Sequence, residues 1–417
     1  MATLKLTESM NEVASAAASY SRSRVDHGNG TNPVSTEPRS DEQDIVQPTS
    51  LRSPIRIGID GRLFTVHHTG IGRYILELCK ALDRLLPSAT FYVYNPFAIE
   101  LPPISERWIA RVDPRWPGQG LGSSLWLKAR VGKLCTRDSV DVFWGCCAQL
   151  PVLPRTIRAV ITLYDLNEFV TPQTMSIRTR VSRGLWRRDL RRADAIVTIS
   201  HGTARRLLEC MSLETAAVVP PAVSNRFAPQ GEAEIARVLG THGLKEPYFL
   251  SVATWEPRKN LTALVRAFLD LRRQGALGSH QLVLVGGRGW KDRRLAALVT
   301  QAEGDGVVPL GYVPDENLPA LYSAATALVF PSLYEGFGMP VLEARACGTR
   351  VVVSDVPELR EAGGDSAIYI PPSEAGIRAG LLAAAELGRG LQPSGLWSWE
   401  KSANALVKVL VGERERT

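Results

Sequence analysis

Short apolar segments alternate with amphipathic segments along most of this sequence, and this alternation limits the possible folds more than any other feature. Strand-like runs are separated by segments whose apolar residues recur at helical spacing, as in TGIGRYILELCKALDRLL. The strand-like runs are IRIGID, FYVYN, DVFWG, AVITLYD, ADAIVTIS and AAVVPPAV, and later PYFLSVAT, QLVLVGG, VVPLGYV, TALVFPS and RVVVSD. Strands that alternate with helices indicate parallel sheets covered on both faces. We therefore predict an α/β fold with two tandem Rossmann-like, doubly wound domains that face a central cleft, where such sheets bind ligands.

Changes in composition predict the domain boundaries. Residues 1–52 are rich in Ser, Thr, Asn, Asp and Glu and poor in large apolar residues, which is typical of a disordered tail. The polar stretch SNRFAPQGEAE interrupts the strand–helix pattern around residues 225–245. We expect an N-terminal domain over residues 53–228, a C-terminal domain over residues 229–392 and a last amphipathic helix within residues 393–417.

Charge and cysteine content exclude some classes of protein. The net charge of +7 favours anionic partners such as sugar nucleotides, phospholipids or nucleic acid, although a solvated basic surface is the plainer interpretation. The 6 cysteines form no C-x-x-C pair and no zinc spacing, so we expect reduced, mostly buried thiols and no metal site. The sequence has neither a signal-peptide pattern nor an apolar run of the roughly 18 residues that span a bilayer, so we expect a cytoplasmic protein.

The stretch YEGFGMPVLEA carries the strongest candidate site. It follows a buried strand, so Glu335 is expected in the loop beyond the strand's carboxyl end. Pro340 suits the first residue of a helix, which would place Glu343 in the first helical turn. The N–H groups there can bind an anion, and the carboxylates can accept hydrogen bonds from hydroxyls of a sugar and a ribose. The alternative is a plain strand–turn–helix whose glutamates only complement the helix dipole.

Two glycines and a phenylalanine lie between these glutamates. Gly336 and Gly338 permit backbone conformations and a close ligand approach that a Cβ atom would prevent. We expect Phe337 to be exposed in this turn, where it would serve folding little. The three residues are therefore candidates for donor binding.

A basic pair and further glycine turns follow other predicted strands. Arg258 and Lys259 precede a helix that should begin near Asn260, and two cations there suit a diphosphate, unless they form only a solvated turn. Glycines follow the strands before HHTGIGRY and within LVGGRGW. They resemble fragments of phosphate-binding loops but fit simple tight turns equally well. The candidates are Gly70, Gly72 and Gly286.

Seven arginines crowd the helical segment between Arg178 and Arg192, SIRTRVSRGLWRRDLRRAD. Such a helix can lie on an anionic membrane, or it can be a solvated face above a core stripe. Aromatic residues do not alternate with these arginines as in a stacking platform, so we do not expect nucleic acid as a partner.

Together these segments resemble the retaining GT-B glycosyltransferases of family 4, which include bacterial mannosyltransferases. The resemblance covers about residues 55 to 410. Its strongest part is FPSLYEGFGMPVLEARACGT, which contains the E-x7-E signature of the family, and EPRKNL, GYVPDENLPALYSAA, TGIGRY, ADAIVTIS and WSWEKSA fit the same group.

The resemblance implies roles for the matching residues. Glu335 would contact hydroxyls of the transferred sugar, and Glu343 would hold the nucleotide ribose. Lys259 and Arg258 would neutralise the leaving diphosphate, which the glycine turns approach. The N-terminal domain would bind the acceptor, the C-terminal domain the nucleotide sugar, and the last helix would cross back onto the N-terminal domain.

The sequence departs from the family at TLYDL, where members usually have His before Asp. Tyr164 replaces this His, which is thought to bind the sugar near the reacting carbon, and Asp165 remains. The arginine that usually lies six residues before the lysine is also absent, and Arg258 is its candidate substitute. A non-catalytic sugar-nucleotide-binding protein on a degenerate transferase fold therefore stays open as an alternative.

The reaction implied is transfer of a hexose, with mannose from GDP-mannose as first choice, to a polysaccharide or a lipid-linked saccharide. Alternative donors are dTDP-rhamnose and UDP-glucose. The resemblance implies no metal ion or other cofactor, and a cytoplasmic enzyme, with peripheral contact to the inner face of the membrane as an open possibility. A glycoside hydrolase that uses Glu335 and Glu343 is the competing enzyme class, because such enzymes pair two carboxylates.

Overall fold

The computed structural model describes residues 54–64, 70–99, 101, 104–113, 116, 121–146, 148–172, 186–289, 293–390 and 396–412. The predicted disordered tail, residues 1–52, lies outside these ranges. Part of the arginine-rich segment, residues 173–185, also lies outside them. Both sheets described below belong to the same compact unit of the chain.

The N-terminal sheet is parallel throughout, with the order β3-β2-β1-β4-β5-β6-β7 within the described residues. Most of the predicted strand runs form these strands, because Val, Ile, Phe and Tyr fit a sheet buried on both faces. The edge strand β3 was not predicted, since exposed residues interrupt its apolar pattern. The strands are β1 (Arg56–Asp60), β2 (Thr90–Asn95), β3 (Trp108–Val112), β4 (Val142–Gly145), β5 (Arg158–Leu163), β6 (Ala195–Thr198) and β7 (Ala217–Val218).

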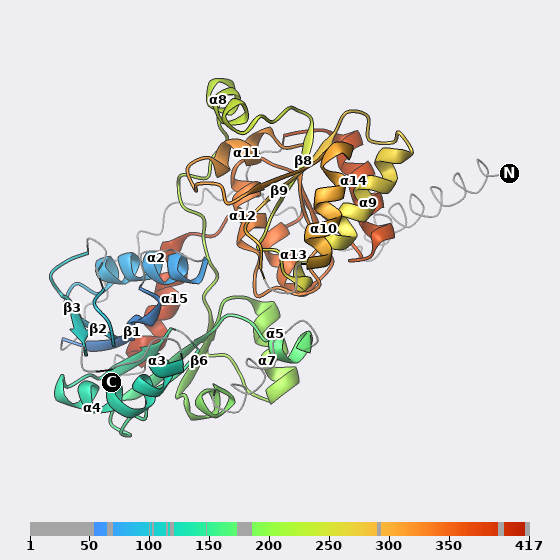
Figure 1. Ribbon diagram of the computed structural model, residues 1–417. Coiled ribbons are helices and arrows are strands. Elements are labelled where there is room, and N and C mark those ends of the chain that lie inside the picture. The colour runs from blue at the N-terminus through green and yellow to red at the C-terminus, as the bar shows by residue number, and fades with distance from the viewer. Residues whose placement is uncertain are drawn as a thin grey trace, which may run out of the picture. The chain divides into compact units, whose positions relative to one another are not determined.

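Helices cover both faces of this sheet (Figure 1). On one face α2 packs on Ile57 and Ile59, and on the other the helices after residue 121 pack on Tyr94 and Phe143. The helical elements are η1 (Gly61–Leu63), α2 (Gly70–Leu85), α3 (Leu121–Trp126), η2 (Leu127–Val131), α4 (Gly132–Arg137), α5 (Asn167–Val170) and α7 (His201–Met211), and residues 186–192 are also helical.

The C-terminal sheet is also parallel, with the order β10-β9-β8-β11-β12-β13 within the described residues. Neighbouring residues point to opposite faces, so Phe249 joins the core under α9, α10 and α14, while Leu250 joins the core under α11 to α13. The strands are β8 (Tyr248–Val252), β9 (Gln281–Val285), β10 (Val307–Gly311), β11 (Ala327–Phe330), β12 (Val351–Ser354) and β13 (Ile368–Ile370).

The helices of this half include one that the sequence did not predict. α8 lies within the polar stretch near residues 225–245, where only every third or fourth residue is apolar and buried. The elements are α8 (Glu232–His242), η4 (Pro257–Lys259), α9 (Leu261–Arg273), α10 (Arg293–Ala302), η5 (Glu303–Asp305), α11 (Leu318–Ala324), α12 (Met339–Ala346), α13 (Pro357–Gly363), α14 (Glu374–Leu387) and α15 (Trp399–Val411).

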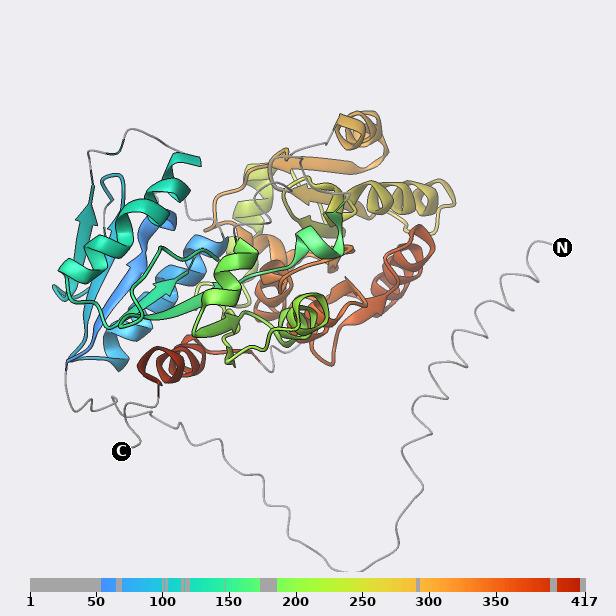
Figure 2. The same ribbon diagram turned by 90° about the horizontal axis from the view of Figure 1, so that it is seen from below.

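The last helix, α15, packs against the N-terminal half of the chain. It lies beside α2, and its buried Leu406 and Leu410 belong to the same core as Ile57 (Figure 2). The Ser402 hydroxyl donates a hydrogen bond to the Pro220 carbonyl over 2.6 Å. The contacts of α15 with β4, β6 and β7 place it on the N-terminal sheet. No helix among the described residues has both the length and the hydropathy needed to cross a bilayer.

Candidate active site

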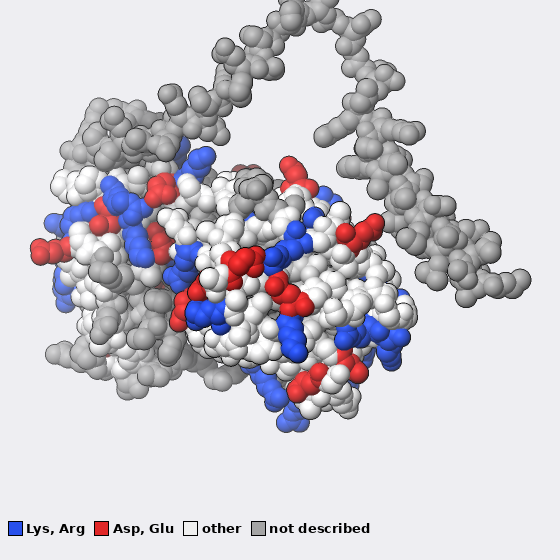
Figure 3. Space-filling view, turned by 90° about the horizontal axis from the view of Figure 1, so that it is seen from above, with Lys and Arg blue, Asp and Glu red and all other residues white. Residues whose placement is uncertain are grey.

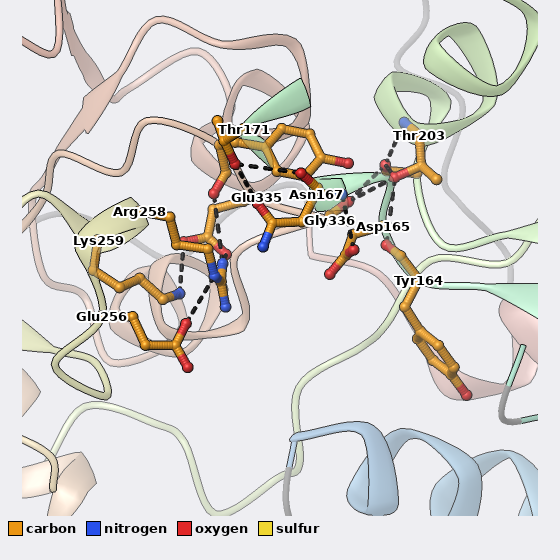
Figure 4. Close-up of polar contacts among 12 residues, drawn as sticks. Tyr164, Asp165, Asn167, Thr171, Thr203, Glu256, Arg258, Lys259, Glu335 and Gly336 are labelled. Carbon is orange, nitrogen blue, oxygen red and sulfur yellow. Dashed lines mark hydrogen bonds and ion pairs between the residues drawn. The ribbon is translucent and has the colours of Figure 1, made fainter. Parts of the chain in front are cut away.

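The Glu335 carboxylate lies between two cations at the carboxyl edge of the C-terminal sheet (Figure 4). Glu335 is in the loop between β11 and α12, and only 7% of its side chain is exposed. One carboxylate oxygen accepts a hydrogen bond from Lys259 Nζ at 2.6 Å, and the other accepts one from Arg258 Nη1 at 2.8 Å. Glu335 lies 77 residues after Arg258 and 76 after Lys259 in the sequence, yet the three side chains form one cluster.

Charge balance favours the ionised forms of Glu335 and Arg258, whereas burial lowers the pKa of Lys259 despite the neighbouring Glu335 charge. Burial on its own would raise the pKa of Glu335, but Lys259 and Arg258 outweigh it and hold the pKa below the ordinary value. Burial likewise opposes the charge of Arg258, yet the carboxylates of Glu335 and Glu256 raise its pKa. The Arg258 Nε atom donates to Glu256 over 3.0 Å. The site therefore carries preorganised charge away from bulk water, where charge acts most strongly.

A short turn presents both cations. η4 follows β8, and the Arg258 carbonyl accepts a hydrogen bond from the Leu333 N–H at 2.8 Å, which ties η4 to the Glu335 loop. Asn260 has the left-handed conformation (φ 57°) and ends η4 before α9 begins. Its side chain makes no capping bond but donates to the Pro372 carbonyl over 2.9 Å. Asn260 thus occupies the N-cap position, as the predicted helix start implies, but its side chain does not cap the helix.

Asp165 and Tyr164 follow β5, and their side chains point in different directions (Figure 4). Burial raises the pKa of Asp165, while the Asn167 N–H and the nearby Arg258 and Lys259 charges oppose the rise. Asp165 therefore lies within electrostatic reach of the Glu335 cluster. The Tyr164 ring instead turns away from Glu335 and packs edge-on against Tyr74. Its hydroxyl donates a hydrogen bond to the Cys146 carbonyl over 2.6 Å.

Gly336 is required by contact with the N-terminal half. A Cβ atom on Gly336 would lie 2.2 Å from the Tyr164 carbonyl oxygen. The Gly336 carbonyl accepts hydrogen bonds from the Ser200 hydroxyl at 2.7 Å and from the Thr203 hydroxyl at 3.2 Å. The close approach expected for a ligand is thus made here by the protein's own backbone.

The other residues of the glycine turn also have packing roles. Phe337 is only 2% exposed and belongs to the main core, so the prediction of an exposed phenylalanine is wrong. The sequence could not show this, because the covering residues come from distant segments. Gly338 has φ 103° directly before α12, and a Cβ atom there would lie 2.6 Å from Leu359. Its positive φ is the reason for glycine at this position.

Glu343 is buried inside α12, with partners that the sequence did not predict. The helix begins at Met339, so Glu343 is its fifth residue rather than part of its first turn, and that prediction is wrong. Arg73 Nη1 donates to one carboxylate oxygen over 3.2 Å, and the Tyr322 hydroxyl donates to the other over 3.1 Å. Burial raises the pKa of Glu343 to about 7, although Arg73 and Tyr322 lower it. The available signal for Arg73 was its place beside Gly72 in TGIGRY.

The remaining glycines differ in what the structure requires of them. Gly70 and Gly72 are helical residues at the start of α2; Gly70 is exposed with open space around it, and Gly72 is buried. Gly286 has φ 125°, and a Cβ atom there would lie 2.2 Å from the Ala253 carbonyl oxygen. Its N–H donates to the Gly311 carbonyl over 2.7 Å, so close contact between strand ends accounts for this glycine.

Comparison with known proteins identifies the family. The family model for Glycosyltransferase Family 4 matches residues 68–226, and the model for Glycosyl transferases group 1 matches residues 234–377. The sequence is 32% identical over 361 residues to O-antigen chain mannosyltransferase B of Escherichia coli, covering 80% of this chain and 93% of that one. The chain is a family 4 glycosyltransferase. The predicted family and enzyme class are therefore confirmed.

Other proteins similar to this glycosyltransferase agree with that assignment. It is 30% identical over 320 residues to a GDP-mannose-dependent alpha-(1-6)-phosphatidylinositol monomannoside mannosyltransferase of Mycolicibacterium smegmatis, covering 69% of this chain and 80% of the relative. Its fold matches sucrose-phosphate synthase from Thermosynechococcus elongatus with a TM-score of 0.62 at 20% identity, over 87% of this chain and 96% of that chain. The predicted GT-B fold, with Rossmann-like domains in tandem, is confirmed.

The thiols and the carboxylates of the described residues do not form a metal site. Within the described ranges, no group of three or more His, Cys, Asp or Glu side chains is placed to hold a metal ion. Cys79, Cys135, Cys146 and Cys347 are buried and unbridged, and Cys210 is exposed. The absence of a metal requirement stays a prediction.

Proposed function

We propose that this glycosyltransferase moves a hexose from a nucleotide-diphosphate sugar to a hydroxyl of a polysaccharide or lipid-linked saccharide, with retention of configuration. Mannose from GDP-mannose is the first candidate, because the relatives at 30% identity or more that are named above are mannosyltransferases. The observation that carries the proposal is the buried Glu335 carboxylate held between Lys259 and Arg258 at the carboxyl edge of the C-terminal sheet. Ligands of open α/β sheets bind at this edge.

The proposed roles follow from the charges of these side chains. Lys259 and Arg258 stabilise the diphosphate as it leaves, because positive charge fixed beforehand needs no reorganisation during the reaction. Glu335 is ionised and accepts hydrogen bonds from hydroxyls of the transferred sugar, while it holds both cations in position. The leaving phosphate acts as the base toward the acceptor hydroxyl. Because side-chain cations supply the positive charge, the proposed reaction needs no metal ion or other cofactor.

The competing functions have less support. In a glycosidase the two carboxylates act on the same bond, but Glu335 and Glu343 have separate partners here, Lys259 with Arg258 and Arg73 with Tyr322. The non-catalytic alternative rested on Tyr164 in place of histidine. Its ring turns away from Glu335, and the substitution leaves the contacts of Glu335 with Lys259 and Arg258 in place.

A panel of nucleotide sugars tests the donor. The protein, in buffer that contains a metal chelator, would be mixed separately with GDP-mannose, dTDP-rhamnose and UDP-glucose. The midpoint of thermal unfolding would be measured first and hydrolysis of the donor second. We expect GDP-mannose to raise the midpoint, because a ligand that binds only the folded state stabilises it. A higher midpoint with another donor would replace mannose, and no shift with any donor would count against the function itself.

Glu335→Gln tests the site. The change keeps the shape of the side chain but removes the charge that faces Lys259 and Arg258, so we expect transfer to fall by roughly 10²–10³. Glu256→Gln is the matched control, since the Glu256 carboxylate also contacts Arg258 and, among the described residues, accepts no hydrogen bond from the Lys259 ammonium; it should retain transfer within a few-fold. Thermal unfolding of both variants shows whether the fold survives. Equal losses in the two variants would contradict the role of Glu335.

We also propose peripheral contact of the enzyme with anionic lipids at the cytoplasmic face of a membrane. The described end of the arginine-rich segment supports this, because its arginines line a cavity of about 380 Å³. A neighbouring cavity of about 330 Å³ adds Lys128 and Val152, whose side chain is an exposed apolar group. Among the described residues, Asp189 is the only carboxylate that lines these cavities. The arginines are Arg187, Arg188, Arg191 and Arg192.

A further inference from the structure

Arg73 links the two halves of the enzyme through carboxylates of the C-terminal half. It lies in the first turn of α2, and 15% of its side chain is exposed. Nη1 donates to Glu343, which is 270 residues away in the sequence, and Nη2 donates to Asp315. Because two carboxylates hold its two terminal nitrogens, the guanidinium has a defined position beside Glu343.

The contact leaves acceptor capacity on Glu343. An ionised carboxylate offers about four lone-pair sites to hydrogen-bond donors. Arg73 and Tyr322 are its hydrogen-bond partners among the described residues, one on each oxygen. The remaining sites can accept hydrogen bonds from hydroxyl donors such as the two of a ribose.

We propose that Arg73 is a positioning residue for donor binding, which favours the ionised form of the Glu343 carboxylate and orients it so that it accepts hydrogen bonds from the nucleotide ribose. The inference rests on the proposed function, in which Glu343 holds the ribose. Arg73 comes from the N-terminal half, so the ribose site is complete only when both halves are in contact. A hydrogen bond to an ionised acceptor is roughly twice as strong as one to a neutral acceptor, which is why the ionisation of Glu343 matters.

The charged groups around Glu343 support this assignment. Burial raises its pKa to about 7, and Arg73 is the first of the groups that lower it. Tyr322 from α11 and Arg226 also lower it, while Asp315 raises it. Arg226 lies beside Asp315, at 3.7 Å, rather than on Glu343. Without Arg73, the pKa of Glu343 would rise further, because Arg73 is the first of the groups that oppose the effect of burial.

Cys347, just after α12, is another titratable group close enough to interact with Glu343. Burial is the main reason that its pKa rises to about 12, with the nearby Glu343 charge second. The thiol is therefore neutral at neutral pH and adds no charge to the site. Arg73 is left as the cation that contacts Glu343 directly among the described residues.

The test measures GDP binding by calorimetry over a range of pH in the full-length protein. The terminal phosphate of GDP also ionises in this pH range, and this affects both proteins equally. We therefore divide the dissociation constant of GDP for the Arg73→Gln variant by that for the unaltered protein at each pH, which cancels the contribution of the phosphate. We expect this ratio to be roughly ten near pH 7, as for the loss of a charge-assisted hydrogen bond. The ratio should fall at higher pH, where Glu343 is ionised even without the Arg73 charge. Arg73→Lys should restore most of the affinity.

Controls separate this role from a structural one. Arg84→Gln removes another ion pair of α2, the exposed contact with Glu400, and should leave GDP binding unchanged. In a Glu343→Gln background, Arg73→Gln should have no pH-dependent effect, since the titrating group is gone. A ratio that is constant across pH would overturn the inference, because it would mean that Arg73 only ties the halves together. Failure of the unaltered protein to bind GDP, UDP or dTDP at any pH would instead overturn the proposed function, and this inference with it.

Discussion

Glu335 and Glu343 are both buried glutamates, yet their pKa values move in opposite directions. Glu335 faces two cations, which outweigh the cost of burial and lower its pKa. Glu343 faces one arginine and one tyrosine, which do not, and its pKa rises to about 7. The same side chain can therefore serve as a permanent charge in one place and as a group that titrates near neutral pH in another.

Glu343→Gln should change how stability depends on pH. A carboxyl whose pKa rises from 4.5 in the unfolded chain to about 7 in the folded protein contributes stability that is present below pH 4.5 and is lost as pH rises through 7. Relative to the variant, the unaltered protein should lose about 3 kcal/mol of unfolding free energy over this range. Urea unfolding at several pH values measures this. The exposed Glu209→Gln is the control, and parallel pH profiles for all three proteins would refute the prediction.

At the scale of elements, α7 and α13 form a contact between the halves of the enzyme. The Glu361 carboxylate accepts hydrogen bonds from the N–H groups of His201 and Gly202, over 2.9 and 2.7 Å, at the start of α7. Free N–H groups at a helix start favour such a carboxylate. One helical turn further on, Arg206 Nε donates to the fully buried Glu358 over 2.7 Å.

Two neighbouring arginines of α7 allow a matched comparison of stability. Arg206→Ala leaves the buried Glu358 without its cation, and such a loss costs about 3–5 kcal/mol. Arg205→Ala removes only an exposed pair with Glu209, 3.7 Å apart, which is worth about 1 kcal/mol or less. Urea unfolding of the two variants should therefore differ clearly. Similar small losses would show that the Arg206 pair contributes little to the fold.

At the scale of the whole molecule, the positive charge is unevenly distributed. On the face in Figure 3, basic and acidic side chains are interspersed, as in a solvated surface. The arginines of residues 186–192 instead line two neighbouring cavities. Among the described residues, Asp189 is the only carboxylate that lines them. We expect these arginines, rather than the basic residues elsewhere that contribute to the net charge of +7, to make the proposed membrane contact.

Vesicle flotation tests this. Arg188→Gln with Arg191→Gln should weaken binding to vesicles with anionic lipid by about thirtyfold, since each of the two basic residues contributes about 1 kcal/mol near such a surface and about 1.4 kcal/mol is a factor of ten. Arg293→Gln with Arg294→Gln changes the net charge equally at the exposed start of α10 and should have little effect. Equal binding of all three proteins, or equal binding to neutral vesicles, would refute the membrane contact.

The sequence by itself determined the parallel α/β architecture, because strand and helix periodicities are local and depend on residues a few positions apart. It also located Glu335, Lys259 and Arg258 near one another, since each follows a strand and the carboxyl ends of parallel strands meet at one edge. The edge strand β3 and helix α8 escaped prediction because their apolar patterns are interrupted.

Only the tertiary structure decided which groups these residues contact. The direction of Tyr164, the burial of Phe337 and the partners of Glu343 depend on segments far away in the sequence. The sequence predicted that Gly336 leaves space for a ligand, but the Tyr164 carbonyl group occupies the space where its Cβ atom would lie. Burial and charge pairing arise from packing between distant segments, and local pattern cannot encode them. For that reason the contact of Arg73 with Glu343 could be identified only in the folded chain.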